Sequence, residues 1–208
     1  MQKLNNVKVY ISDTNVIAKI VLFNAALGGK CLVTLLARTL DIITITVISD
    51  ELENWKSSSL KKEKFTHAGI DYIAKMLALS QSLEEQESLT ESQIIVARRK
   101  IQQKENKLQA KGVRLSRQAD DGDIEILEIA QKKKYGLISS DRTVYEVGKD
   151  CGIEMFIFSN LVDTAYTLGL INSSEIKNAV YFIEDVVKDG FLKEDKAIID
   201  RIIDEING

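Results

Sequence analysis

The sequence is poor in residues that build many common catalytic and metal centres: it has one histidine, two cysteines and no proline. The cysteines, Cys31 and Cys151, stand far apart and form no CxxC pair, which excludes a zinc ribbon and indicates a reducing compartment. The single histidine, His67, lies in a segment predicted to be helical. A catalytic centre of the Ser-His-Asp or Cys-His type therefore has little support.

Long apolar runs are also missing, since no uncharged stretch approaches the roughly 18 residues of a membrane-spanning helix. The N-terminal residues lack the features of a signal peptide. A hydrophobic content of 45%, a charged content of 28% and a net charge of −3 describe a globular chain. We expect a cytoplasmic protein without membrane contact, in which any surface for nucleic acid is a local basic patch.

The order of apolar segments predicts alternating strands and helices. Strands are expected at residues 7–11, 42–48, 137–138 and 155–158, because these runs are short and mostly rich in β-branched or aromatic residues. Helices are expected at 16–27, 31–40, 161–169, 173–188 and 192–206. This pattern is typical of an α/β fold, a three-layer α/β/α arrangement around a parallel sheet of about four to five strands.

Residues 56–118 interrupt this alternation. Strand signals vanish there, and helices are predicted at about 57–79 and 91–111, with capping boxes formed by Ser82 with Glu85 and by Thr90 with Gln93. The chain is therefore expected to form one α/β domain over residues 1–165, interrupted by a helical insertion at 56–118. Residues 166–208 are expected to add C-terminal helices that pack on the same domain.

Acidic side chains follow the strands at the point where each strand ends. Asp13 follows the first strand, Asp141 follows the third, and Asp123 stands near the start of the helix between them; Ser49 is a predicted N-cap followed by Asp50, Glu51 and Glu53. The carboxyl ends of parallel strands meet at one edge of a sheet, where ligands collect. Carboxylates there would suit Mg²⁺ or Mn²⁺ and the hydrolysis of a phosphodiester. The alternative is that these acids only cap helices.

Two other phosphate chemistries fit less well. Gly28-Gly29-Lys30 resembles the end of a phosphate-binding loop, but it follows a helix and lacks the upstream glycine. A phosphatase of the haloacid dehalogenase type needs a second aspartate two positions after Asp13, where this chain has Asn15.

Three segments resemble the PIN-domain ribonucleases, near the archaeal and ribosome-biogenesis branch or the toxin-like members: Ser12-Asp13-Thr14-Asn15-Val16-Ile17, Asp123-Ile124-Glu125-Ile126-Leu127-Glu128-Ile129-Ala130 and Leu137-Ile138-Ser139-Ser140-Asp141. The resemblance implies a parallel sheet flanked by helices, and acids that bind Mg²⁺ or Mn²⁺ to cleave single-stranded RNA. It also implies an antitoxin-type protein as a further partner, if the chain is toxin-like.

The resemblance assigns roles to individual residues. It makes Asp13 the first acid, with Thr14 or Asn15 as a polar helper, Asp123 the third acid and Asp141 the fourth. The second acid is Glu53, with Glu51 as the alternative, and Asp120 or Asp121 could replace Asp123. The catalytic acids are thus Asp13, Glu53, Asp123 and Asp141, and the metal-ligand candidates are Asp13, Glu51, Glu53, Asp121, Asp123 and Asp141.

A basic stretch in the insertion is the candidate RNA-binding surface, formed by Arg98, Arg99, Lys100, Lys104, Lys107 and Lys111. Lysine and arginine bind phosphates without reading bases. Two alternatives stay open: these charges form a solvated helix face, or Ile94, Ile101 and Leu108 pack against a partner helix in a homodimer. Together with these charges, the resemblance implies a metal-dependent endoribonuclease that cleaves single-stranded RNA. The alternative is a non-catalytic PIN-fold module that binds RNA or protein.

Overall fold

The computed structural model describes residues 8–191 and 193–204, and its centre is a five-stranded sheet. The strand order is β5-β2-β1-β6-β7, and each neighbouring pair runs parallel. The strands are β1 (Lys8–Ser12), β2 (Leu40–Ile45), β5 (Glu84–Glu85), β6 (Gly136–Ile138) and β7 (Met155–Phe156). Since β1 lies in the middle, the residues that follow it are placed between the ends of β2 and β6.

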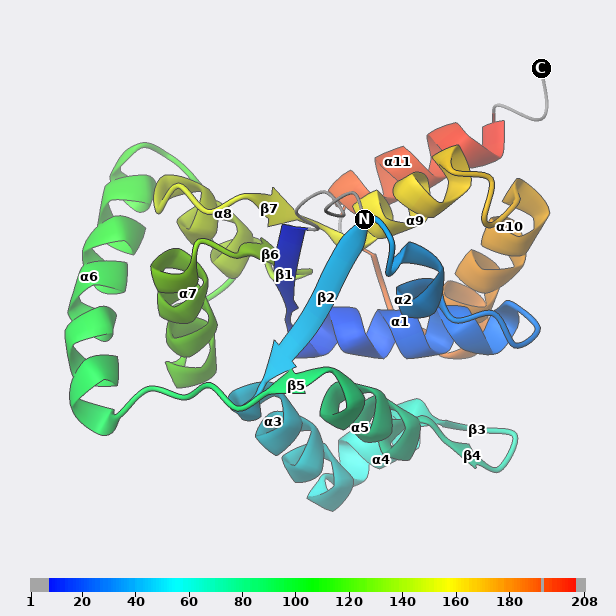
Figure 1. Ribbon diagram of the computed structural model, residues 1–208, viewed down its shortest axis with the longest axis horizontal. Coiled ribbons are helices and arrows are strands. Elements are labelled where there is room, and N and C mark those ends of the chain that lie inside the picture. The colour runs from blue at the N-terminus through cyan, green and yellow to red at the C-terminus, as the bar shows by residue number, and fades with distance from the viewer. Residues whose placement is uncertain (1–7, 192, 205–208) are drawn as a thin grey trace, which may run out of the picture.

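Helices cover both sides of the sheet (Figure 1). One side carries α6 (Glu91–Ala110), α7 (Asp121–Lys133) and α8 (Arg142–Asp150). The other carries α1 (Thr14–Ala26), α2 (Leu32–Leu36), α9 (Phe158–Thr167), α10 (Ser173–Tyr181), the π-helical turn η1 (Phe182–Val186) and α11 (Lys193–Asp204). The fold is therefore α/β, with a parallel sheet between helices. None of the helices in the described ranges is long and apolar enough to cross a membrane.

The contact between Tyr10 and Gly136 sets how closely β1 and β6 approach. The two residues are register partners, and a Cβ atom at Gly136 would lie 2.2 Å from the Tyr10 ring. The ring also packs against Phe156 of β7, with 4.7 Å between the centroids, and its hydroxyl donates to Glu154 at 2.5 Å. Glycine is thus required at position 136 because the Tyr10 ring occupies the space of a side chain.

The second strand is shorter than predicted, because α3 (Thr46–Ser57) begins inside the run 42–48. Ser49 is consequently not an N-cap: it lies within α3, and its hydroxyl donates to Glu84 at 2.5 Å. Thr46 donates to the same carboxylate at 3.2 Å, and Thr44 donates to the Ser80 carbonyl at 2.8 Å. These tertiary bonds explain the early helix start, which an apolar β-branched run does not reveal.

Residues 56–118 contain short strands that the sequence did not predict. The expected helix 57–79 is divided into α4 (Ser59–Phe65), a hairpin of β3 (Thr66–His67) and β4 (Ile70–Asp71), and α5 (Tyr72–Leu83). Here β5 extends the central sheet beside β2, while α5 contacts α1 and α3. This part of the chain thus shares its core with the α/β domain. The predicted helix 91–111 is confirmed as α6, with the Thr90–Gln93 capping box in place.

Several other boundaries differ from the predictions. The capping box of Ser82 and Glu85 is absent, because Ser82 donates to the Leu79 carbonyl and Glu85 belongs to β5. The helix expected over 31–40 is only about one turn long, and β2 begins at Leu40. The strand expected over 155–158 is also shorter, because α9 begins at Phe158. The last helix is confirmed over Lys193–Asp204, and residues 7, 192, 205 and 206 of the predicted elements lie outside the described ranges.

We expect Gly136→Ala to lower the free energy of unfolding by about 2 kcal/mol, because overpacking forces the Tyr10 ring out of its position. Urea denaturation followed by circular dichroism measures this change. The control is Gly190→Ala, since Gly190 has open space around its Cα and no positive φ angle. Equal stability of the two variants would contradict the assigned role of Gly136.

Candidate active site

A solvent-exposed cavity lies where β1, β2 and β6 end, with about 380 Å³ of empty space when the adjoining open solvent is included. Five acids line it: Asp13, Glu51, Asp120, Asp123 and Asp141. The other lining residues are Thr14, Asn15, Val47, Ile48, Arg117, Gly122 and Ile126. The acids lie within α3 and at the N-terminal ends of α1, α7 and α8, so segments distant in sequence converge at one edge of the sheet.

Asp13 is the most deeply buried acid of the cavity, with 5% of its surface exposed. It is the N-cap of α1, where its Oδ1 accepts from the Val16 amide at 2.7 Å. Its Oδ2 accepts from the Ser139 hydroxyl and from the Ser140 amide, the latter at 3.2 Å. Burial raises the pKa of Asp13 to about 6, although these hydrogen bonds and Lys19 oppose the rise.

Asp141 is held by the turn between β6 and α8. It caps α8 by accepting from the amides of Thr143 at 2.6 Å and Val144 at 3.2 Å. Its own amide donates to the Ser139 hydroxyl at 3.0 Å. Ser139 therefore contacts both Asp13 and Asp141, and this shared hydroxyl couples the end of β1 to the start of α8.

Asp123 and Asp120 form a reciprocal capping box at the start of α7. The Asp123 amide donates to Asp120 Oδ1 at 3.0 Å, and the Asp120 amide donates to Asp123 Oδ2 at 2.9 Å. Burial raises the pKa of the Asp123 carboxyl, and the hydrogen bonds from Arg117 and from the Asp120 amide oppose that rise. Asp120 thus serves as the N-cap, while Asp123 presents a carboxylate to the cavity.

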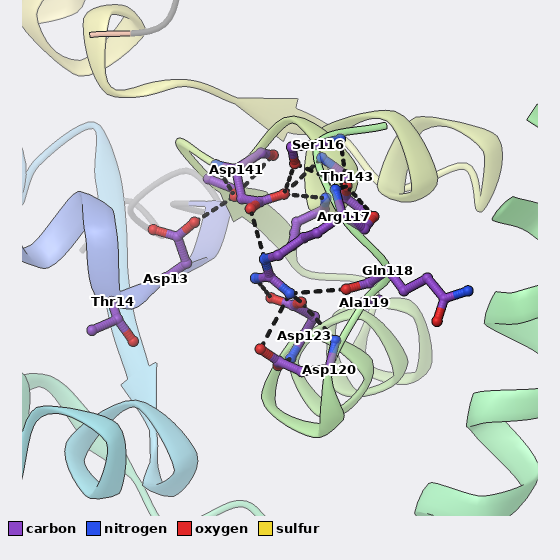
Figure 2. Close-up of polar contacts among 12 residues, drawn as sticks. Asp13, Thr14, Ser116, Arg117, Gln118, Ala119, Asp120, Asp123, Asp141 and Thr143 are labelled. Carbon is purple, nitrogen blue, oxygen red and sulfur yellow. Dashed lines mark hydrogen bonds and ion pairs between the residues drawn. The ribbon is translucent and has the colours of Figure 1, made fainter. Parts of the chain in front are cut away.

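Arg117 lies between these acids, as Figure 2 shows. Its Nη1 and Nη2 donate to the two oxygens of Asp123 at 2.5 and 3.1 Å, a bidentate pair. Its Nη1 also pairs with Asp120 at 3.2 Å, and its Nε pairs with Asp141 at 3.3 Å. Burial alone would lower the pKa of Arg117, but the hydrogen bond to Asp123 and the three carboxylate charges raise it.

The structure brings Glu51, and not Glu53, to the cavity. Glu51 accepts from the Thr14 hydroxyl at 2.5 Å, which links α3 to the start of α1. Glu53 lies two positions further along α3, and two positions rotate a side chain by about 200° around the helix axis. Glu53 therefore faces away from Glu51. It is exposed and pairs with Lys56 at 2.9 Å. Of these two glutamates, Glu51 therefore lines the cavity and Glu53 does not.

The remaining candidates are placed as follows. Thr14 and Asn15 both line the cavity, and Thr14 is the one that contacts an acid there. Asp121 points elsewhere and pairs with Arg98. Within residues 8–191 and 193–204, no group of three or more acidic, histidine or cysteine side chains is arranged to hold a metal ion. The carboxylates surround the Arg117 guanidinium instead.

Most of the predicted RNA-binding residues form ion pairs with acids of their own domain. Lys104 and Lys107 both pair with Asp150, at 2.8 and 3.4 Å, and Lys100 pairs with Glu128 at 3.5 Å. Arg98 pairs with Asp121, while Arg99 and Lys111 are exposed. These ion pairs attach α6 to α7 and α8, so a phosphate would have to compete with them.

The apolar row of α6 faces the interior of the same chain. Ile101 and Leu108 are 4% and 7% exposed, and α6 contacts α7 and α8. The expectation that Ile101 and Leu108 pack against a partner helix is therefore wrong, because both are already buried. The exposed apolar residues of this helix are Ile95 and Val96.

Sequence reasoning missed three contributors to the site: Arg117, Ser139 and Thr143. Arg117 was not predicted as a site residue, although it stands three positions before Asp120, with which it forms an ion pair. Ser139 lies in a segment that resembles the PIN-domain ribonucleases but was assigned no role, and Thr143 carried no sequence signal. Their roles follow from the turn geometry between β6 and α8.

Comparison with protein-family models and with curated proteins finds no match for this chain.

The raised pKa of Asp13 predicts how stability depends on pH. The folded chain holds this proton up to about pH 6 and the unfolded chain releases it near 3.9, so stability falls as pH rises between these values. In EDTA, the titration of Asp13 should lower the free energy of unfolding by about 3 kcal/mol between roughly pH 4 and pH 7. Asp13→Asn should remove this pH-dependent decrease. Urea denaturation at both pH values measures it, with exposed Asp50→Asn as the control. Parallel pH profiles of Asp13→Asn and wild type would contradict the prediction.

The ion pairs of α6 predict that Lys104→Glu lowers the free energy of unfolding by about 1 kcal/mol, because a carboxylate then faces Asp150. Arg99→Glu, on the exposed side of the same helix, should change it far less. Denaturation at low and high salt checks this difference, which should shrink as salt screens the charges. If both charge reversals lowered the free energy of unfolding equally, the contact with Asp150 would not contribute to stability.

Proposed function

We propose that this chain is a metal-dependent endoribonuclease of the PIN-domain kind that cleaves single-stranded RNA. One observation supports this most strongly: the cavity at the carboxyl ends of β1, β2 and β6 is lined by carboxylates from four separate elements. In open parallel sheets this edge is where ligands bind and reactive groups gather. Helix capping explains Asp13, Asp120 and Asp141 singly, but it does not explain why Glu51 joins them.

The acids of the cavity are the type of donor that a hard divalent cation prefers, although in this structure they surround the Arg117 guanidinium. All the acids offer oxygen ligands, which Mg²⁺ and Mn²⁺ prefer, and the guanidinium of Arg117 already occupies the cluster as a stand-in cation. Asp13, Asp123 and Asp141 would hold the ion, with Glu51 as the further acid. When bound, such an ion polarises a phosphodiester and lowers the pKa of water at the site.

The chain's own residues orient these acids. Ser139 donates to the Asp13 carboxylate and accepts from the Asp141 amide. The Asp141 carboxylate is held separately, by the amides of Thr143 and Val144. Thr14 donates to Glu51 and thereby links α3 to the start of α1. Such preorganisation favours catalysis because little rearrangement is needed at the moment of reaction.

A second candidate function is a PIN-fold module that binds RNA or protein without cleavage. The observation that favours it is the Arg117 guanidinium, which neutralises part of the acid cluster. In that case Mn²⁺ would not bind, and the acids would serve structure alone. Calorimetry with Mn²⁺ separates the two functions.

The proposed function predicts different effects of two substitutions on the same helix. Glu51→Gln should lower Mn²⁺-dependent cleavage of a single-stranded RNA oligonucleotide by about tenfold or more, because the side chain lines the cavity. Glu53→Gln should leave the rate unchanged, since this side chain faces Lys56. Gel electrophoresis of labelled RNA with Mn²⁺, and with EDTA as the blank, measures both rates.

Asp13→Asn and Asp141→Asn provide the reference, since each should abolish cleavage while the protein stays folded by circular dichroism. Undiminished cleavage by both aspartate variants would refute the proposed function. A loss with Glu53→Gln but not with Glu51→Gln would instead reassign the second acid.

A further inference from the structure

Arg117 brings a positive charge into a cavity lined by five acids. It contacts three of them and uses both oxygens of Asp123, at 2.5 and 3.1 Å, together with one oxygen of Asp141 at 3.3 Å. A metal ion held by Asp123 and Asp141 would need the same oxygens. The guanidinium and a divalent cation therefore compete for one set of ligands.

The backbone around Arg117 is fixed independently of its side chain. The Thr143 hydroxyl accepts from the amides of Ser116 and Arg117, at 3.1 and 3.2 Å, and donates to the Arg117 carbonyl at 2.8 Å. The side chain itself is 41% exposed and extends from this anchored turn into the cluster. It can consequently rotate away from the acids while the segment that carries it remains in place.

We propose that Arg117 is a built-in competitor of the divalent cation, so that metal entry displaces its guanidinium from the acid cluster toward the incoming RNA. This inference rests on the proposed function, and it gives the site a regulated resting state. Without metal, the guanidinium balances the carboxylates and holds the start of α7 close to the start of α8.

The displaced guanidinium gains a second role at the rim of the cavity. Its planar array of donors matches phosphate oxygens as well as it matches carboxylates. Because Thr143 keeps the turn in place, the freed group stays near the acids and near the phosphodiester that they would act on. Metal binding and binding of the phosphate backbone are thus linked through one side chain.

The test is calorimetric titration of Mn²⁺ alone into the wild-type chain and into Arg117→Gln. When a competitor occupies a site in most molecules, the apparent dissociation constant for the ion rises in inverse proportion to the fraction of free sites. Arg117→Gln should therefore bind Mn²⁺ roughly tenfold or more tightly than the wild type. The matched control is Arg114→Gln, an exposed residue three positions earlier, which should bind Mn²⁺ as the wild type does.

Arg117→Lys keeps the charge but cannot form the bidentate contact with Asp123, so its Mn²⁺ affinity should fall between those of wild type and Arg117→Gln. If Arg117→Gln fails to fold, tighter binding by Arg117→Lys than by wild type supports the proposal. Affinity equal to or weaker than that of wild type, in whichever variant folds, overturns it. Absence of Mn²⁺ binding to every variant overturns it as well.

RNA cleavage separates this inference from the proposed function. If the wild type cleaves RNA with Mn²⁺ but Arg117→Gln binds the ion no more tightly, the competition is refuted and the nuclease stands. If Arg117→Gln binds Mn²⁺ more tightly but neither protein cleaves RNA, the competition stands and the nuclease is refuted.

Discussion

The site depends on one buried carboxylate, that of Asp13. A charge 5% exposed is costly to bury, and this chain offsets the penalty with three hydrogen bonds from two different segments. The Val16 amide belongs to the helix that Asp13 itself caps, whereas Ser139 and Ser140 belong to the turn after β6. Asp13 therefore joins the ends of two neighbouring strands, and the positions of Asp141 and α8 follow from this connection.

The sequence was sufficient to predict those helices and strands whose local residue pattern agrees with their tertiary contacts. The β1–α1 and β6–α8 units have apolar strands, acidic N-caps and helices with a buried face, and each of these features has its own local signature. The same applies to α6, where Thr90 and Gln93 mark the start and Gly112 follows the end. The meeting of Asp13, Asp123 and Asp141 at one cavity then follows from parallel topology.

Where prediction failed, distant contacts decided the structure. The boundary between β2 and α3 depends on Glu84, which accepts hydrogen bonds from Thr46 and Ser49. Nothing in the run 42–48 indicates a partner so far along the chain. This boundary also determines which glutamate reaches the cavity, because an earlier helix start places Glu51 on the face with Val47 and Ile48. The ion pairs of α6 were likewise invisible, since Asp150 lies 43 positions from Lys107.

The start of α8 fixes both an acid of the cavity, Asp141, and the separate segment that carries its counterion, Arg117. Asp141 caps the first turn of this helix, and Thr143 of the same turn anchors the backbone at Ser116 and Arg117. Asp141 and the backbone of Arg117 are therefore attached to the same turn. Asp123 belongs to α7, however, so its pair with Arg117 lengthens whenever α7 and α8 separate. The Arg117–Asp123 pair therefore depends on the spacing between α7 and α8, whereas Asp141 and the backbone of Arg117 belong to one unit of contacts.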